Sequence, residues 1–305
     1  MPIDRDKALR ADPSVREIRW STRDVLLYHL SLGAGAAAAT DPEPHLTYEK
    51  GLTVLPTFAL VAGTGISAGE APAPGMEMPG IDVDLRAVLH AGQGLEVHRP
   101  LPASGTATLR SRVAEVWDKG KAALIVLESA ATGPDGASLW TTTTRIWARG
   151  EGGFGQDTGH GSGPGPGPEE RWTAPDRPAD TVITTATTPQ QALWYRLNGD
   201  LNPLHADPAF ARAAGFERPI LHGLASYGLV AKALVDGVLD GDVTRLTGLA
   251  VRFAGPLVPG ESIATSVWRD GPPADDGTER LLLHAACPER DGAPVLTHAT
   301  ATVRS

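Results

Sequence analysis

Residues 223–238 read Gly-Leu-Ala-Ser-Tyr-Gly-Leu-Val-Ala-Lys-Ala-Leu-Val-Asp-Gly-Val. Apolar side chains recur in this stretch at helical spacing: Tyr227, Val230, Ala231, Leu234, Val235 and Val238. The pattern predicts a mostly apolar helix, and such a helix must be covered by other elements. Strand-like segments follow at 262–268, 281–287 and 295–304. We therefore expect an antiparallel sheet that wraps around this helix.

The two ends of the chain carry a similar order of signals. Ser21-Thr22-Arg23-Asp24 reads as a helix-start capping box, and Thr188-Pro189-Gln190-Gln191 reads as another with Pro at the first helical position. Each box precedes an apolar stretch that contains a tyrosine, Tyr28 or Tyr195. The two boxes and the two tyrosines are both separated by 167 residues. We interpret the chain as two related repeats, with chance similarity of two short segments as the alternative.

Pro-containing turns at 99–105 and 255–260 each lead into strand-like sequence. The strands expected after the first of these turns are 106–117, 122–129 and 139–148. The early repeat has no clear counterpart of the apolar helix, because residues 55–61 run into the Gly/Pro-rich segment 62–80. We therefore expect its helix to be reduced.

Gly and Pro are densest between residues 150 and 178, where the sequence offers almost nothing to bury. This segment is typical of a linker. The expected organisation is a first repeat over 1–150, a linker over 151–180 and a second repeat over 181–305.

Composition narrows the class of protein. The 305 residues include 27 basic and 36 acidic side chains, a net charge of −9, and no Lys/Arg cluster, so a nucleic-acid partner is not expected. No apolar run approaches the roughly 18 residues of a membrane-spanning helix, and the first residues do not resemble a signal peptide. The single cysteine, Cys287, cannot form an intrachain disulfide, which fits a reducing compartment. We expect a cytoplasmic protein.

The stretch 195–208 is the candidate for chemistry, because it places Asp200, Asn202 and His205 within six residues between two helix-like segments. Gly and Pro interrupt the helix there, and a loop can bring the three side chains together where a continuous helix would separate them. Each residue taken alone is also an ordinary turn, cap or structural residue. Further on, Gly223 opens the apolar helix with a backbone N–H that suits an anion or a developing oxyanion.

A metal hydrolase that uses Asp200, His205 and His222 is a remote alternative, because these residues lack a typical metal-site spacing. A dinucleotide fingerprint is absent from the sequence. We therefore expect no metal and no cofactor.

These residues resemble the hydratase 2 branch of the MaoC-like hot-dog proteins, especially the enoyl-CoA hydratase 2 part of peroxisomal multifunctional enzyme type 2. The resemblance covers almost the whole chain and rests on an ordered series of motifs. They lie at 23–28, 54–58, 95–102, 118–120, 152–155, 195–205, 214–216, 219–223 and 251–254.

The resemblance implies an α+β chain with two hot-dog repeats, each a curved antiparallel sheet around a helix. It also implies a (3R)-specific trans-2-enoyl-CoA hydratase, a hydro-lyase. By the family's motif, Asp200 and His205 are the catalytic pair, Asn202 is a supporting amide and Gly223 is the oxyanion-hole donor. The further substrate contacts that the resemblance implies are His90, Ala91, Lys119 and Phe253; position 91 is glycine in family members and alanine here.

In the first repeat, Gly33 and Ala38 are the positions 167 residues before Asp200 and His205. Neither can move a proton, so this repeat cannot be a second active site. The resemblance implies that it accommodates the acyl tail.

Two other functions remain open. The same catalytic loop would serve a dehydratase of (3R)-hydroxyacyl thioesters on acyl carrier protein, since a catalyst accelerates both directions. A non-catalytic acyl-CoA-binding hot-dog protein is the alternative from another class, although binding alone does not need the Asp200 and His205 pair. The expected partners are 2-enoyl-CoA or 3-hydroxyacyl-CoA, without membrane or nucleic acid, and the expected assembly is a homodimer.

Overall fold

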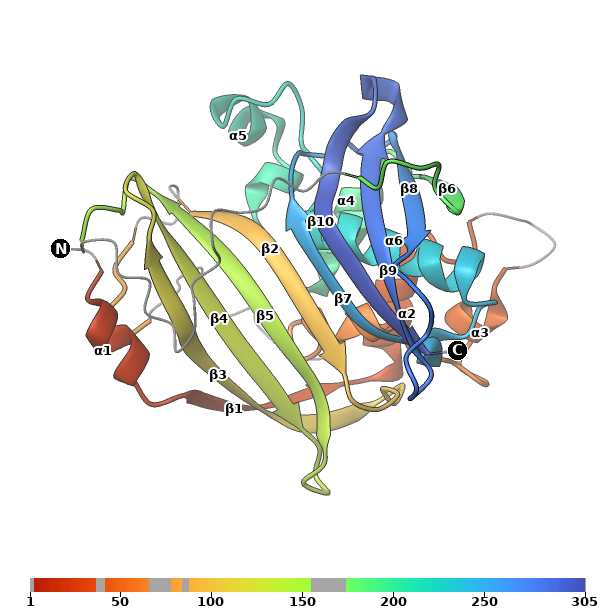
Figure 1. Cartoon of the computed structure of the whole chain (residues 1–305), viewed down its shortest axis with the longest axis horizontal. Coiled ribbons are helices and arrows are strands. Elements are labelled where there is room, and N and C mark those ends of the chain that lie inside the picture. Colours follow the sequence, from red (N-terminus) through yellow and green to blue (C-terminus); the bar gives the residue numbers. More distant parts are fainter. Residues whose placement is uncertain (1–2, 37–41, 66–77, 84–87, 155–173, 305) are drawn as a thin grey trace.

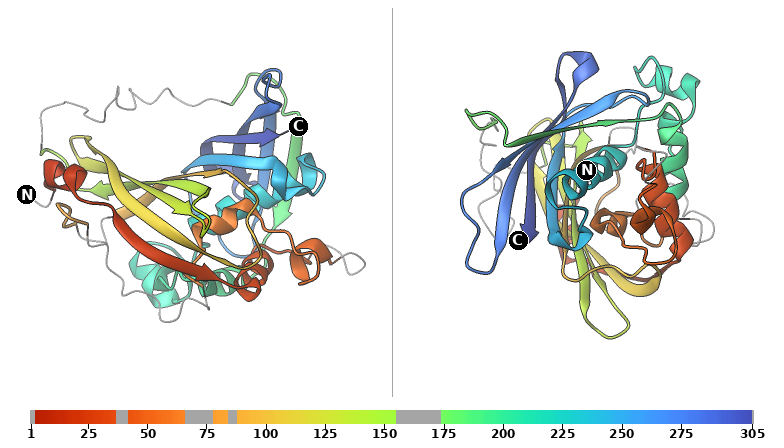
Figure 2. Two further views of the ribbon diagram at one scale, coloured as in Figure 1. Left: turned by 90° about the horizontal axis from the view of Figure 1, so that it is seen from below. Right: turned by 90° about the vertical axis from the view of Figure 1, so that its right-hand side faces the viewer.

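The computed structural model describes residues 3–36, 42–65, 78–83, 88–154 and 174–304. The described residues form one ten-stranded antiparallel sheet with helices on one of its sides (Figures 1 and 2). The strands are β1 (Ser14–Trp20), β2 (Val88–Val97), β3 (Gly105–Asp118), β4 (Ala122–Thr132), β5 (Ser138–Arg149), β6 (Thr181–Ala186), β7 (Leu246–Phe253), β8 (Ser262–Arg269), β9 (Thr278–Cys287) and β10 (Ala293–Arg304). The six strands expected after the two turns are therefore present.

The helical elements are short apart from α2 and α6. They are α1 (Arg5–Arg10), α2 (Thr22–Ser31), α3 (Pro44–Thr47), η1 (Pro56–Leu60), α4 (Gln191–Tyr195), η4 (Arg196–Asn198), η5 (Pro203–His205), α5 (Pro208–Ala213), α6 (Gly223–Val238), η6 (Val243–Arg245) and η7 (Pro288–Arg290). None of the described helices combines the length and the apolar run needed to cross a bilayer.

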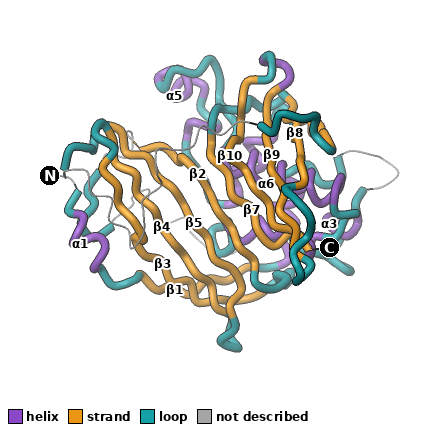
Figure 3. Tube along the Cα trace, viewed as in Figure 1, coloured by secondary structure: helices purple, strands orange, loops and turns teal. Residues whose placement is uncertain are grey.

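The strand order shows the internal repeat. The order across the sheet is β1-β3-β4-β5-β2-β7-β10-β9-β8-β6, so each half of the sheet has the same order when read from its outer edge. The halves join where β2 pairs with β7, in a register that runs from Gly92 opposite Arg252 to Glu96 opposite Gly248. The two repeats thus share one continuous sheet, and Figure 3 shows β2 and β7 side by side where the repeats join.

Equivalent helices of the two repeats pack against each other at the junction. The tyrosines at equivalent positions, Tyr28 on α2 and Tyr195 on α4, are both fully buried with ring centroids 6.2 Å apart. The side-chain amide of Asn198 donates to the hydroxyl of Ser31, which is its own equivalent 167 residues earlier. Contacts between equivalent positions are what a duplicated unit makes with its copy around a twofold axis.

The capping boxes form as expected at the first site and in part at the second. The Asp24 carboxylate accepts hydrogen bonds from the backbone N–H and the hydroxyl of Ser21. At the second site Gln191 Oε1 accepts from the backbone N–H of Thr188, but α4 begins at Gln191 and not at the proline. The prediction of Pro at the first helical position was wrong, because the segment first closes a turn from Gln191 N–H to the Thr188 carbonyl.

The predicted apolar helix is α6, and it lies against the concave side of the sheet (Figure 2). Every residue from Ala225 to Val235 is buried. Gly228 is needed for this packing, since a Cβ there would lie 2.8 Å from the Leu32 side chain. Burying this many apolar side chains, at roughly 1.5–3 kcal/mol each, makes α6 the centre of the core.

The first repeat has η1 where the second has α6. The five residues of η1 contain buried Phe58 and pack against α6. The Gly/Pro-rich segment 62–80 lies partly outside the described residues, and so does the expected linker, between the end of β5 at Arg149 and the start of β6 at Thr181.

Candidate active site

The loop that follows α4 and η4 is fixed at a glycine. Gly199 has φ +114°, and a Cβ at this position would lie 2.3 Å from the backbone oxygen of Thr64. The Thr64 hydroxyl donates to the carbonyl of Asn198 at 2.8 Å. Only glycine combines this backbone angle with this close approach. Residues of the first repeat therefore set the point where the chain turns into the candidate catalytic loop.

A second contact ties the same loop to the first repeat. Asn198 is buried, and its amide nitrogen donates to the Ser31 hydroxyl at 3.0 Å and to the Tyr195 carbonyl at 2.9 Å. Ser31 in turn donates to the carbonyl of Tyr28. A buried amide with satisfied donors restricts the loop to one position.

The loop then presents a carboxylate and an imidazole. Asp200 is exposed, and its Oδ1 accepts from the backbone N–H of Asn202. Asn202 Oδ1 accepts from the backbone N–H of Leu204 and so caps η5, the turn that carries His205. The structure thus uses the side-chain oxygen of Asn202 to shape the loop.

His205 is held with one nitrogen available for chemistry. Its Nδ1 is 2.9 Å from the carbonyl oxygen of Ile220, which can only accept, so Nδ1 carries the hydrogen and Nε2 carries the lone pair. Burial lowers the pKa of His205 below 6.5, although the Ile220 carbonyl and the Asp200 charge oppose that shift. His205 is therefore a neutral base near pH 7.

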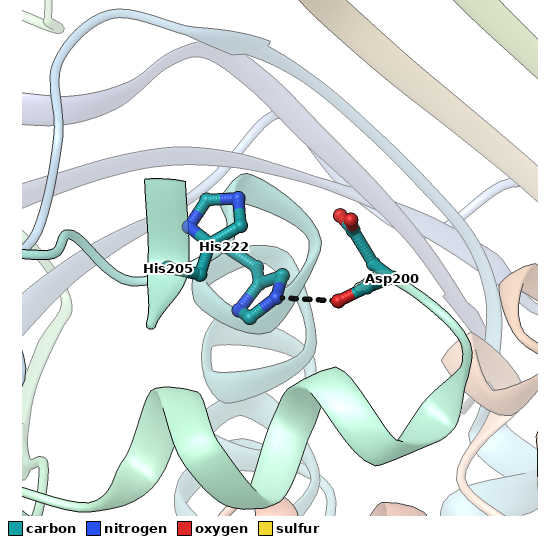
Figure 4. Close-up of side chains that lie close together, drawn as sticks. All are labelled: Asp200, His205 and His222. Carbon is teal, nitrogen blue, oxygen red and sulfur yellow. Dashed lines mark hydrogen bonds between the residues drawn. The ribbon is translucent and has the colours of Figure 1, made fainter. Parts of the chain in front are cut away.

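His222 contacts both of these residues (Figure 4). Its Nε2 is 3.2 Å from the backbone oxygen of Asp200, and its ring stacks on the His205 ring with centroids 3.7 Å apart and planes 26° apart. Burial, with a smaller contribution from the neighbouring His205, lowers the pKa of His222 to about 4. His222 therefore remains uncharged beside His205 at neutral pH.

One side-chain polar atom from each of Asp200, His205 and His222 lies within 4.8 Å of the other two. Two groups at that separation can both form hydrogen bonds of about 2.8 Å to one water molecule. The cluster also contains the residues of the metal-hydrolase alternative. Stacked rings hold their lone pairs in two nearly parallel planes, however, whereas tetrahedral ligands converge on one point. The stacked arrangement is unlike a regular tetrahedral metal site.

Three more of the expected residues border this cluster. Gly223 is the first residue of α6, and a Cβ on it would lie 3.1 Å from the Phe253 ring, so Phe253 lies directly over the helix start. The His90 ring lies edge-on to Phe253, with centroids 4.7 Å apart. Burial lowers the pKa of His90, whereas its hydrogen bond to Gln93 and the charge of Asp200 raise it. β2 of the first repeat and β7 of the second thus both reach the site.

The neighbouring residue Ala91 is the extra residue of a β-bulge. The pairing of β2 with β5 shifts register between His90 and Gly92, which leaves Ala91 without an opposite residue. The bulge turns the backbone of β2 directly after His90.

Lys119 lies apart from these residues. It occupies the turn between β3 and β4, with Nζ 5.9 Å from the Trp117 ring. β5 and β4 separate β3 from β2, so Lys119 is roughly 15 Å across the sheet from the His90 strand at the usual strand spacing. A single ligand that contacts both Lys119 and His90 would have to be as long as an acyl-CoA.

Sequence reasoning missed the residues that position the loop. Thr64 and Ser31 are far from Asp200 along the chain, and His222 was considered only as a metal ligand. Gly199 carried the one available signal, since a glycine between a helix and a polar loop is typical of a positive φ angle.

Family comparisons agree with the two repeats. Residues 19–150 match the MFE-2 hydratase 2 N-terminal domain, and residues 171–282 match the MaoC like domain. The chain is 46% identical over 297 residues to enoyl-CoA hydratase ChsH3 of Mycobacterium tuberculosis, which covers 97% of this chain and 98% of that protein. It is 37% identical to the peroxisomal enoyl-CoA hydratase 2 of Arabidopsis thaliana, over 83% of this chain and 82% of that protein.

A solved structure shows the same architecture. The crystal structure of a MaoC-like dehydratase from Phytophthora capsici superposes with a TM-score of 0.83 at 30% identity, and the match covers 98% of both chains. The protein is therefore a MaoC-like double hot-dog protein of the α+β class, as the sequence predicted. Within that class, the chain belongs to the enoyl-CoA hydratase 2 family.

Proposed function

We propose that the protein is a (3R)-specific trans-2-enoyl-CoA hydratase, which adds water reversibly to 2-enoyl-CoA and yields (3R)-3-hydroxyacyl-CoA. The observation that carries this proposal is that Asp200 and His205 bring side-chain polar atoms within 4.8 Å of each other, while the contact to Ile220 leaves the lone pair of His205 Nε2 available. The relatives named as enoyl-CoA hydratases support the same reaction.

The loop residues supply the acid and base. His205 Nε2 accepts one proton of the water while the water oxygen forms its bond to C3, and Asp200 accepts the second O–H hydrogen bond and stabilises the imidazolium. The electron pair of the C2–C3 double bond moves toward the thioester and forms an enolate. The proton then passes to C2, so that one H and one OH have been added and the enzyme is unchanged. Because the same residues deliver the OH and the H, both are added to the same face of the C2–C3 double bond.

The start of α6 supplies the stabilising charge. The amide of Gly223 belongs to the first turn of α6, and no described residue accepts a hydrogen bond from it. We propose that this N–H donates to the thioester oxygen as negative charge develops there. His90 and Phe253 border the same space, and we propose that they, together with Ala91 in the bulge next to His90, contact the substrate beside the thioester.

The first repeat holds the acyl tail in this proposal, and the second repeat holds the chemistry. In the first repeat, η1 is much shorter than α6, which leaves less helix beneath that half of the sheet. Lys119 would pair with a CoA phosphate at the far side of the sheet. An extended fatty acyl chain should then be accepted, and a steep loss of activity beyond four carbons would contradict the role of the first repeat.

One assay tests the reaction and its carrier. Crotonyl-CoA and longer 2-enoyl-CoA thioesters are incubated with the protein, the loss of enoyl absorbance is followed, and the chirality of the product is determined. The proposal predicts hydration to the (3R) product. Faster turnover of the matching acyl carrier protein thioesters would support the dehydratase alternative, and tight binding without turnover would support the non-catalytic alternative.

Location and assembly are part of the proposal. A cytoplasmic location is supported by the single buried cysteine, which requires no oxidising compartment. A homodimer is supported by five exposed large apolar side chains near the catalytic loop: Leu193, Trp194, Leu197, Leu201 and Phe210. Light scattering coupled to size exclusion should give twice the chain mass, and a monomer would remove that part of the proposal.

A further inference from the structure

His222 is built into the site from three sides. It immediately precedes α6, and its side chain is almost completely buried. One face of its ring stacks on His205, Tyr195 packs against it with centroids 5.0 Å apart, and its Nε2 points at the backbone oxygen of Asp200. It is therefore in contact with both members of the proposed catalytic pair.

The contacts define the state of the ring. A carbonyl oxygen only accepts, so the hydrogen of His222 lies on Nε2 and is donated to Asp200. Nδ1 is buried and has no hydrogen-bond partner among the described residues. Neither nitrogen can then exchange a proton with a substrate, because one is committed to the loop and the other faces the interior. A direct acid or base role is excluded by this geometry.

We infer that His222 is a positioning residue, which sets the separation of Asp200 from His205 by donating to the Asp200 carbonyl while its ring supports the His205 ring. The inference rests on the proposed hydration reaction for its catalytic consequence. Misplacement of catalytic groups by about 1 Å can cost on the order of a hundredfold in rate, so this contact matters to turnover.

The first repeat provides an internal comparison. The position 167 residues before His222 is Leu55, and the position before Asp200 is Gly33. The first repeat thus lacks both the carboxylate and the imidazole that we infer positions it. The backbone N–H of Leu55 donates to His29 Nε2 instead, so this segment is held by a different contact.

Three variants separate the two parts of the role. His222→Leu removes both the donor and the ring, His222→Gln keeps an N–H donor near the Nε2 position, and His222→Phe keeps the ring alone. For crotonyl-CoA we expect kcat of His222→Leu to fall about 10- to 100-fold with KM within about twofold. We expect His222→Gln to recover most of that loss and His222→Phe to recover little. His284→Gln on β9, outside the site, is the matched control and should equal the parent.

Failure of the His222 inference and failure of the proposed function give different results. Unchanged kcat in His222→Leu, or equal losses in His222→Leu and His222→Gln with equal melting temperatures, would overturn the inference while leaving the hydratase proposal intact. Absence of hydration in the parent protein would remove the proposed function instead. Nitrogen-15 NMR of the parent tests the contact without activity: we expect the Nε2–H tautomer for His222 at pH 7, and the Nδ1–H tautomer would refute it even if every variant failed to fold.

Discussion

The two repeats have the same strand order but different residues at the positions of the candidate site. At the positions equivalent to Asp200 and Gly223, the first repeat has Gly33 and Pro56. Glycine has no carboxylate and proline has no backbone N–H, so the first repeat lacks both groups that we propose for acid–base and oxyanion chemistry in the second. Pro56 still begins a helical turn, which shows that the backbone course survives without the donor.

What the repeats have kept in common is packing. Tyr28 and Tyr195 remain in contact, and Ser31 bonds to Asn198 across the junction. Ser31 and Thr64 hold the loop that carries Asp200, while His90 reaches the site from β2. The first repeat therefore supports the loop on which we propose the catalytic groups of the second repeat lie.

The largest effect is expected when the proposed catalytic pair, which only the second repeat carries, is removed. Asp200→Asn or His205→Gln should lower crotonyl-CoA hydration at least about a hundredfold, because acid–base catalysis is lost while the fold is unchanged. Steady-state kinetics with circular dichroism as the folding control measures this. Turnover near that of the parent would exclude both residues from the chemistry.

Copying the first repeat's proline into the second tests the oxyanion donor. Gly223→Pro deletes one N–H at the first position of α6, where proline is well tolerated, and His222 before it already has a compatible backbone (φ −59°, ψ 138°). We expect kcat to fall about a hundredfold.

Gly223→Ala is the control for that variant. It places a Cβ equally close to the Phe253 ring but keeps the N–H. If Gly223→Ala loses as much activity as Gly223→Pro, then crowding of Phe253 and not the missing donor is the cause, and the oxyanion role fails.

Acid should destabilise both repeats through one buried histidine in each. Burial lowers the pKa of His29, and that of His222, to about 4. The unfolded chain binds these protons near pH 6.5, so between pH 6.5 and about 4 the unfolded state holds more protons and stability falls as the pH falls. Each site contributes roughly 2 to 3 kcal/mol over this range.

His29→Gln should reduce the acid sensitivity. Urea denaturation of the parent and of this variant at pH 7 and pH 4.5 gives the difference in unfolding free energy. We expect the variant to lose roughly 2 to 3 kcal/mol less than the parent between the two values. Equal losses would show that the pKa of His29 is not lowered in the folded protein.

The smallest expected effect concerns the junction. Ser31→Ala removes the acceptor of the Asn198 amide, and we expect a loss of about 1 kcal/mol in stability with turnover reduced only a few-fold. Ser129→Ala, whose hydroxyl faces Ser111 between β3 and β4, is a control away from the loop. If the Ser31 variant lowers activity no more than the Ser129 variant, then the first repeat does not support the loop through this bond.

Much of the fold was predictable from local pattern. The apolar periodicity of residues 223–238 predicted α6, and strand-like sequence after each Pro-containing turn predicted the last three strands of each repeat. β2 and β7 were not predicted, because glycines such as Gly92 and Gly248 weaken a strand pattern. The structure gives their reason: a Cβ on Gly92 would lie 2.9 Å from the Val251 carbonyl, so glycine permits the close pairing that joins the repeats.

The residues of the candidate site were also predictable only in part. Asp200, Asn202 and His205 were found because they are adjacent in the chain. Thr64 and Ser31 lie more than a hundred residues from the loop that they hold. No periodicity or motif marks such a contact, since it exists only after the sheet has brought the repeats together.

By itself the sequence determined the local features of the protein. These are an apolar helix, strand-like segments, and a loop that contains an acid, an amide and an imidazole. Those properties depend on side chains within a few residues of one another, and local spacing records them. Only the tertiary structure decided which nitrogen of His205 is free, what lies against it, and that Lys119 is three strands from His90. These depend on distances between segments far apart in the chain, and chain folding alone sets those distances.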